Sequence, residues 1–418
     1  MENRLKIFVS AYACEPGLGS EIGVGWHWVL EMSKYFELWV LTRESNRHTI
    51  EPWITAHPEY SSIHFLYYDW PKWARFWKKG LRGVRTYYNI WQTCTDSIVK
   101  QTMQENGISI YHHLTYGNAL WKVSNYGQKQ YFIWGPTSAG TVIPKDFTKH
   151  YRPLSRVKES LQRFIKKTLF MNIGFRNRCK HANLILCKTD DTIECVPQKY
   201  RDKCIQFTDV AVDIKDVSLY VSEKRLGKEI RFFAAGTMVG WRNFDVLIDA
   251  FTEAVKRNNQ ISLHILGSGG EYMHLHNRVS ERNMENHIKM PGQVNMETYY
   301  KYLAESDIII NPCFREGAVT VSFDSMNFAK PLICFDTKGY THNFLQEHFR
   351  IIKGITTRSE AVKRLSEEIL YMADPDRIKA MGQKAIEAGK QSDWQHKGEN
   401  IYKIIRKYYG NNVSASIK

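Results

Sequence analysis

Short apolar runs alternate with longer amphipathic stretches along most of this chain. The runs predict strands in both halves, over 5–12, 37–42, 63–67, 108–113, 130–135, 183–187 and 204–207, then over 229–235, 261–266, 287–290, 307–311 and 331–335. Strands separated by helical stretches favour parallel sheets covered by helices on both faces. The pattern therefore predicts an α/β fold.

A polar, mixed stretch interrupts this alternation in the middle of the chain. It covers residues 208–229, and the alternation starts again after it. A chain of 418 residues is long enough for two domains of about 200 residues each. We predict a first Rossmann-like domain over 1–210, a linker over 211–228 and a second doubly wound domain over 229–393.

Composition narrows the class of protein. The chain is 43% hydrophobic and 24% charged, which is ordinary for a globular protein. No apolar run reaches the roughly 20 residues that span a bilayer, and the first run ends in a loop, so we expect neither a transmembrane helix nor a signal peptide. The eight cysteines include no Cys-x-x-Cys pair. We therefore expect reduced thiols, no structural zinc site and a cytoplasmic protein.

The net charge of +15 is confined to two segments of the first half. Residues 70–95 hold six Lys and Arg and no acid, and residues 149–180 hold ten Lys and Arg against Glu159 alone. These excesses together equal the charge of the whole chain. Such clustering predicts an anionic partner for the two segments.

A glycine-rich stretch, "EPGLGSEIGVGW", follows the first predicted strand. It places Gly17 and Gly19 between that strand and a helix, where free N–H groups at the helix N-terminus bind phosphate well. The third glycine of a dinucleotide fingerprint is replaced by Ile22. A tight turn without a ligand remains the alternative.

Two further stretches carry candidate chemistry in the second half. In "RFFAAGTMVGWRNF", a strand enters Gly236 and Arg242 stands just before a helix, where it can share a diphosphate with the helix amides; an ordinary surface arginine is the alternative. In "REGAVTVSFD", Glu316 and Asp324 lie eight residues apart around a helix start. Two carboxylates so placed can accept hydrogen bonds from a polyol, or can simply be a capping acid and a solvated acid.

These three stretches in this order, with "LHILGSGG" and "MPGQV", resemble family 4 of the retaining glycosyltransferases. That family has the GT-B fold, in which two doubly wound Rossmann-like domains face each other across a cleft. "ACEPGLGSEIGVGW", "YHHLTYGNAL" and "WGPTSAG" are similar to a bacterial subgroup that acts in polysaccharide assembly, including lipopolysaccharide or capsule. Asp324 takes the place of the second glutamate of the family's E-x7-E signature. The resemblance also implies that a final helix, about 394–410, packs back on the first domain.

The resemblance implies roles for these residues around a nucleotide-diphosphate sugar. Glu316 would hold donor-sugar hydroxyls, Asp324 the ribose diol, and Arg242 the diphosphate in place of the usual lysine. The loop at Gly17 and Gly19 would face the diphosphate and sugar. Further donor-binding positions would be Ala318, Val319 and Thr320 at the helix N-terminus and Val294 along the base.

The resemblance also implies a mechanism with no metal and no other cofactor. The departing phosphate would itself deprotonate the acceptor on the same face of the sugar. His113, at the end of a predicted strand, is the candidate polar group on the sugar side, and a structural role for it is equally compatible with the sequence. The chain departs from the family signature at Thr237, where relatives often have arginine, and at Val319, where they often have glycine.

Residues 70–91 combine cations with an apolar stripe at helical spacing. A basic, tryptophan-bearing amphipathic helix predicts binding to an anionic membrane surface, and a helix packed on its own domain is the alternative. The stripe consists of Trp73, Trp77, Leu81, Val84, Tyr88 and Trp91. The second basic segment, 149–180, is predicted to bind the same surface.

The sequence therefore predicts a glycosyltransferase that transfers a sugar, with retention, from a nucleotide-diphosphate donor to a glycan or lipid-linked glycan. It would lie peripherally on the inner face of the membrane as a monomer or weak dimer. A nucleotide-sugar epimerase or sugar phosphorylase of the same fold is the alternative among enzymes. A basic RNA-binding protein is the alternative from another class, but no RNP-type or KH-type signature is present, and we expect no nucleic-acid partner.

Overall fold

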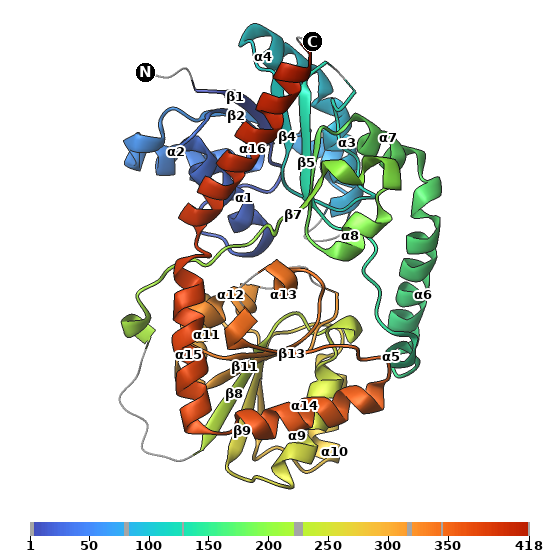
Figure 1. Cartoon of the computed structure of the whole chain (residues 1–418), viewed down its shortest axis with the longest axis vertical. Coiled ribbons are helices and arrows are strands. Elements are labelled where there is room, and N and C mark those ends of the chain that lie inside the picture. Colours follow the sequence, from blue (N-terminus) through green and yellow to red (C-terminus); the bar gives the residue numbers. More distant parts are fainter. Residues whose placement is uncertain are drawn as a thin grey trace. The chain divides into compact units, whose positions relative to one another are not determined.

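The computed structural model describes residues 4–78, 83–127, 129–220, 229–315, 320–343 and 346–416. The chain divides into two compact units (Figure 1). The first comprises residues 1–140, 167–209 and 394–418, and the second comprises 141–166 and 210–393.

The first unit is built on a seven-stranded parallel sheet of order β3-β2-β1-β4-β5-β6-β7. The strands are β1 (Lys6–Ser10), β2 (Glu37–Arg43), β3 (His64–Tyr68), β4 (Ile110–His113), β5 (Tyr131–Thr137), β6 (Leu184–Cys187) and β7 (Cys204–Gln206). The strand order reverses between β1 and β4, and ligands of such sheets bind beyond the carboxyl ends of the strands at this point.

Helices flank this sheet, and the last one belongs to it despite its distance in sequence. The rings of Trp394 and His27 stack with centroids 4.9 Å apart, and those of Tyr402 and Tyr35 stack at 4.8 Å, so α16 packs along α1 (Figure 1). The helices are α1 (Ser20–Ser33), α2 (Arg47–Ala56), α3 (Val84–Cys94), α4 (Asp96–Glu105), α7 (Ile173–His181), α8 (Asp190–Cys195) and α16 (Trp394–Ser416).

The second unit repeats the architecture with a six-stranded parallel sheet of order β10-β9-β8-β11-β12-β13. Its strands are β8 (Ile230–Ala235), β9 (Ile261–Leu266), β10 (Ile288–Gly292), β11 (Ile308–Asn311), β12 (Leu332–Phe335) and β13 (Phe349–Ile352). Its helices are α5 (Lys145–Lys149), α9 (Phe244–Val255), α10 (Tyr272–Glu281), α11 (Met296–Glu305), α12 (Thr320–Asn327), α13 (Tyr340–Asn343), α14 (Arg358–Met372) and α15 (Pro375–Lys390), and α6 (Pro153–Thr168) leads from this unit back to the first. Both sheets confirm the predicted fold class of two doubly wound Rossmann-like units.

The predicted boundary of the first domain is wrong at one segment. Residues 141–166, assigned by sequence to the first domain, belong to the second unit. The reason is packing, because Ile143, Phe147 and Tyr151 are buried in the same apolar cluster as Phe232 and Phe244 of the second sheet and its helix.

The predicted single helix over 70–91 is also wrong. A short 3₁₀ helix ends at Arg75, and α3 begins only at Val84. Gly83 has φ of 75°, and a Cβ there would lie 2.7 Å from the indole of Trp77, so the chain turns at this glycine. Residues 79–82 lie outside the described ranges.

The apolar stripe predicted for this segment therefore splits in two. Tyr88 and Trp91 are fully buried in the core of the first unit, while Trp73 remains 79% exposed. Arg75 pairs with the buried carboxylate of Asp69 at 3.0 Å rather than facing solvent freely. No helix within the described ranges is long and apolar enough to cross a bilayer.

Candidate functional site

Three glycine loops meet at the carboxyl edge of the second sheet. Gly236 follows β8, Gly267 and Gly269 follow β9, and Gly292 ends β10. The Gly236 N–H donates to the Leu266 carbonyl at 3.0 Å, and the Gly267 N–H donates to the Gly292 carbonyl at 2.8 Å. The loops are thus joined by backbone hydrogen bonds.

This close approach requires glycine. At Gly267, with φ of 129°, a Cβ would lie 2.1 Å from the Gly236 carbonyl oxygen. At Gly269, with φ of 157°, it would lie 2.4 Å from the Met238 carbonyl oxygen. These glycines therefore let the loops pack main chain against main chain, which makes a floor of backbone at this edge, here called the glycine floor.

Arg242 lies against this floor. A Cβ on Gly236 would meet its guanidinium Nη1 at 2.6 Å, so the arginine side chain returns from the Gly240–Arg242 turn to the end of β8. The turn is fixed by Asn243, whose backbone is left-handed and whose amide donates to the Pro312 carbonyl at 3.0 Å. Tyr151 donates to the Asn243 side-chain oxygen at 2.6 Å. The structure thus brings Gly236 and Arg242 together, as the sequence predicts.

A second arginine accompanies Arg242. The guanidinium groups of Arg242 and Arg315 lie 5.2 and 5.4 Å from the ring of Trp241. Arg315 is also ion-paired with the buried Glu159 of α6. Because Glu159 balances the charge of Arg315, Arg242 is the cation of this pair that suits a diphosphate. Sequence reasoning found neither Trp241 nor Arg315, although both adjoin residues that it singled out.

Asp324 lies in α12 with its carboxyl group buried. Only 7% of the residue is exposed, and the hydroxyl of Tyr299 in α11 donates to its Oδ2 at 2.7 Å. Burial raises the pKa of Asp324 to about 7, against the lowering effects of the Tyr299 hydrogen bond and of Lys215. Tyr299 was missed by sequence reasoning because only the tertiary structure brings α11 to α12.

Several predicted donor-binding residues fall outside the described ranges. These are Glu316, Ala318 and Val319, whereas Thr320 is the first residue of α12. Val294 follows β10 and is half-buried, and the neighbouring Gln293 accepts a hydrogen bond from Ser268 at 2.9 Å. The loop predicted along the base thus contacts the loop after β9.

The glycine loop of the first unit is open. Gly17 and Gly19 are exposed, and a Cβ on either would meet nothing within 4 Å. Neighbouring Glu21 of α1 accepts a hydrogen bond from the Tyr116 N–H at 2.7 Å, which ties this helix to the loop after β4. The packing of this unit therefore leaves Gly17 and Gly19 free for another role.

His113 ends β4 in the core of the first unit. It is 1% exposed, and its Nε2 is 3.0 Å from the Tyr88 hydroxyl. Burial lowers the pKa of His113 to about 3, so the ring is neutral near pH 7. This placement favours the structural role over the catalytic one.

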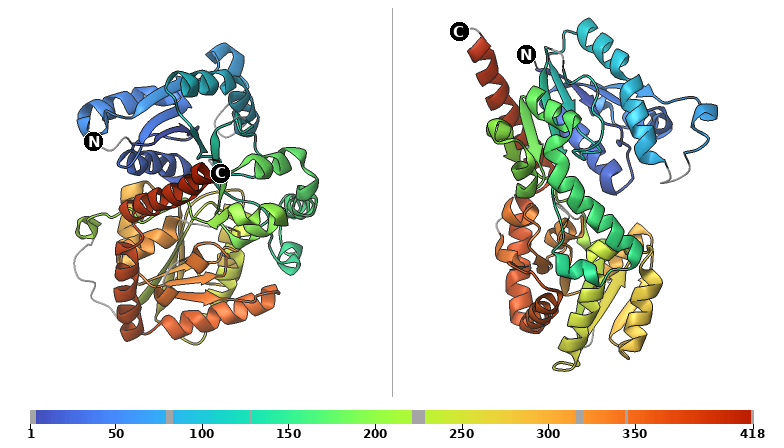
Figure 2. Two further views of the ribbon diagram at one scale, coloured as in Figure 1. Left: turned by 45° about the horizontal axis from the view of Figure 1, so that its top comes forward. Right: turned by 90° about the vertical axis from the view of Figure 1, so that its right-hand side faces the viewer.

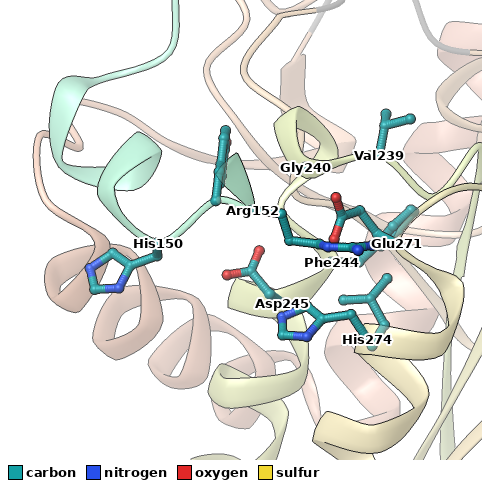
Figure 3. A pocket seen from close by; sticks show the side chains of 10 residues that line it. His150, Arg152, Val239, Gly240, Phe244, Asp245, Glu271 and His274 are labelled. Carbon is teal, nitrogen blue, oxygen red and sulfur yellow. The ribbon is translucent and has the colours of Figure 1, made fainter. Parts of the chain in front are cut away.

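Two hollows of the second unit lie away from Gly236 and Arg242. One cavity of about 20 Å³ lies beside the Gly240 turn, between Tyr151, Phe244 and His274, and has room for about one water molecule (Figure 3). A more open hollow of about 660 Å³ borders α9 and α14, where Asp249 is ion-paired with Arg278, Arg282 and Arg358. Neither includes Gly236 or Arg242. Among the described residues, no three His, Cys, Asp or Glu side chains gather as metal ligands would.

Residues 221–391 match the family model "Glycosyl transferases group 1". The match covers less than half of the chain and falls within the second unit, and its first residues lie in the linker that the sequence predicted. Gly236, Arg242 and Asp324 all lie within the matched residues.

A curated relative of the chain has a related name. The chain is 23% identical over 151 residues, or 36% of its length, to a poly(ribitol-phosphate) alpha-N-acetylglucosaminyltransferase of Staphylococcus aureus, and this match covers 30% of the relative. The chain spans less than half the length of the curated relatives that it matches.

Solved structures share the fold over nearly the whole chain. A sucrose-phosphate synthase of Thermosynechococcus elongatus aligns with a TM-score of 0.62 at 12% identity, covering 98% of this chain and 100% of its own. The Anabaena HepE structure in complex with UDP and glucose aligns with a TM-score of 0.57 at 12% identity, covering 97% and 100%. These similarities confirm the predicted GT-B fold.

Proposed function

We propose that the chain is a retaining glycosyltransferase that transfers a sugar from a nucleotide-diphosphate donor to a glycan or lipid-linked glycan. The observation that carries the proposal is the glycine floor after β8 and β9 with Arg242 against it, within the residues that match the family model. Backbone without side chains and a fixed cation are what a diphosphate requires.

The charges suggest how the residues act. Breaking the sugar–diphosphate bond leaves negative charge on the diphosphate and oxocarbenium character on the sugar. Arg242, against the glycine floor, would stabilise the leaving group, and a preorganised group of this kind is worth about 3 kcal/mol. The departing phosphate would deprotonate the acceptor on the same face, so no metal and no protein nucleophile is required.

The experiment that tests this proposal is a screen of UDP-, GDP- and ADP-sugars by thermal shift, followed by an assay of donor hydrolysis. UDP-sugars come first, because the Anabaena structure of the same fold is a complex with UDP and glucose. The assay is run with and without EDTA, and turnover should be equal. Stabilisation by none of the nucleotide sugars would overturn the proposal.

Replacing Arg242 with alanine is expected to weaken nucleotide-diphosphate binding much more than nucleoside binding. The loss for the diphosphate should be about 1.5–3 kcal/mol, the value of a hydrogen bond to a charged group, or roughly 10- to 150-fold in Kd. Titration calorimetry with UDP and uridine measures both. Arg257→Ala, which removes an exposed arginine just beyond α9, is the matched control. Equal losses of affinity for UDP and uridine would show that Arg242 does not contact the phosphates.

Donor affinity is expected to rise with pH through neutrality. If the Asp324 carboxylate accepts the ribose hydroxyls, binding needs its ionised form, and its raised pKa of about 7 leaves that form scarce at pH 6. Affinity should grow up to about 10-fold between pH 6 and 8 and then level off. Tyr299→Phe removes a bond that lowers this pKa, so it should move the rise to higher pH.

Stability of the free protein should change in the opposite direction. The folded state binds the Asp324 proton more tightly than the unfolded state, so this group lowers the free energy of unfolding as pH rises from about 4 to about 7. Asp324→Asn should remove both dependences, as denaturation and UDP titrations at each pH can show. A wild type whose affinity is flat from pH 6 to 8 would separate Asp324 from the ribose.

The acceptor side of the proposal rests on the basic segments. We propose that the chain lies peripherally on the inner face of a membrane, close to a lipid-linked glycan of the kind used in polysaccharide or lipopolysaccharide assembly. Trp73 and Phe76, exposed by 79% and 74%, support such a surface in residues 70–78, even though the continuous helix predicted there is absent.

A further inference from the structure

Helix α6 exposes the apolar side chains that an ordinary surface helix would bury. Leu154, Val157, Leu161 and Phe164 recur at spacings of three, four and three residues and so share one face. They are 79%, 66%, 56% and 63% exposed. In the right-hand view of Figure 2, α6 (green) faces the viewer.

The opposite face of α6 is held to the second unit by polar contacts. Glu159, 3% exposed, pairs with Arg315, and Ser155 donates to Glu271 at 3.2 Å. Leu161 lies two residues after Glu159 and so about 200° around the helix axis. The ion pair therefore fixes which face α6 turns to solvent, and it is the apolar one.

The exposed surface of α6 is also cationic. Glu159 is the only acid between residues 149 and 180, and it is buried, so α6 itself carries no exposed carboxylate beside its lysines and arginines. Lys158 is exposed about 40° beyond Leu154, and Lys167 is exposed on the other flank of the stripe. The surface thus combines about three turns of aliphatic and aromatic side chains with flanking positive charge.

We propose that α6 docks into the headgroup region of an anionic membrane, with Leu154, Val157, Leu161 and Phe164 entering the bilayer interface. Large exposed apolar patches mark protein or membrane contacts. The flanking cations, on a helix that exposes no acid of its own, match the negative surface of anionic lipids. Nucleic acid would not use a stripe of three aliphatic residues. The docking surface deepens the proposed function, because it would hold the enzyme beside a membrane-borne acceptor.

The test is flotation of the full chain with vesicles of phosphatidylcholine alone and with 30 to 40% phosphatidylglycerol (roughly the anionic content that gives a strong surface potential). Wild type should bind the anionic vesicles. Leu161→Gln with Phe164→Gln should lower the partition coefficient at least about 10-fold, because both side chains leave the interface. Lys158→Gln with Lys167→Gln should lower it by about 5-fold per cation at low salt and little at high salt.

The matched control is Leu219→Gln with Met273→Gln, which removes two apolar side chains that are 72% and 64% exposed elsewhere in the second unit. It should bind vesicles as wild type does. Binding by the α6 variant equal to that of wild type would overturn the proposal. A second result would also overturn it. If the wild type does not bind vesicles but forms a dimer in size-exclusion chromatography, and the Leu161→Gln/Phe164→Gln variant does not form this dimer, a second copy of the chain covers the stripe.

Donor hydrolysis separates this proposal from the proposed function. The α6 variant should hydrolyse a nucleotide sugar at the wild-type rate, since none of its substitutions touches Gly236, Arg242 or Asp324. If the chain binds vesicles but binds no nucleotide sugar, the proposal of the docking surface stands and the proposed function is wrong. If the wild type hydrolyses the donor and the Leu161→Gln/Phe164→Gln variant still binds vesicles as wild type does, the docking surface is wrong and the proposed function stands.

Discussion

Replacing Glu316 with alanine is expected to reduce sugar transfer by about 100-fold or more, because misplacing the reacting sugar by about 1 Å already costs this much. The resemblance assigns Glu316 to the donor-sugar hydroxyls. It follows Arg315, which the structure places over Trp241 beside Arg242. Glu316 itself lies outside the described residues, so this role rests on the resemblance.

The measurement is steady-state transfer and donor hydrolysis, with circular dichroism to confirm that the fold is retained. Glu297→Ala is the matched control, since Glu297 is an exposed acid of the same unit that pairs with Lys301 one turn along α11. Its turnover should equal that of wild type. Near-normal turnover in Glu316→Ala would remove this residue from the donor site.

The strands of both sheets could be predicted from the sequence because their signal is local. Each predicted run corresponds to a strand in one of the two sheets. One strand, β13, was not predicted, because its sequence "FRII" contains an arginine and is only four residues long, so it forms no clear apolar run. Its Arg350 instead pairs with Glu368 of α14 at 2.7 Å. A short edge strand of this kind is specified by its neighbours more than by its own sequence.

The candidate site could be predicted only in part, for a similar reason. Gly236 and Arg242 belong to one strand–loop–helix stretch, so their proximity was predictable from local order. Tyr299 reaches Asp324 from a different helix, and Arg315 reaches Glu159 across 156 positions of the chain. Partners so distant in sequence leave no periodic signal in a single chain.

The spacing of apolar residues predicted a single helix over 70–91, which is wrong because spacing alone does not register that a glycine can end a helix. Gly83, in a left-handed conformation against Trp77, ends the helix that the spacing predicts. In α6 the sequence shows apolar residues at helical spacing, but it does not show whether that apolar face is buried or exposed. The tertiary contacts, above all the ion pair between Glu159 and Arg315, show that the polar face is the buried one.

Replacing Glu159 with glutamine is therefore expected to destabilise the second unit strongly. The side chains of Glu159 and Arg315 are only 4% and 20% exposed, and removing one partner leaves the other charge buried and unpaired. Such a loss is typically about 3–5 kcal/mol. It should appear as a lower midpoint of the second unit's transition in urea denaturation.

The control and the double variant distinguish the ion pair from general damage to α6. Glu253→Gln breaks an exposed pair with Lys256 in the same unit and should change stability by less than about 1 kcal/mol. Glu159→Gln combined with Arg315→Met should be more stable than Glu159→Gln alone, because no uncompensated charge is then left in the interior. If Glu159→Gln unfolds at the wild-type urea concentration, the pair does not anchor α6, and the outward direction of its apolar face must have another cause.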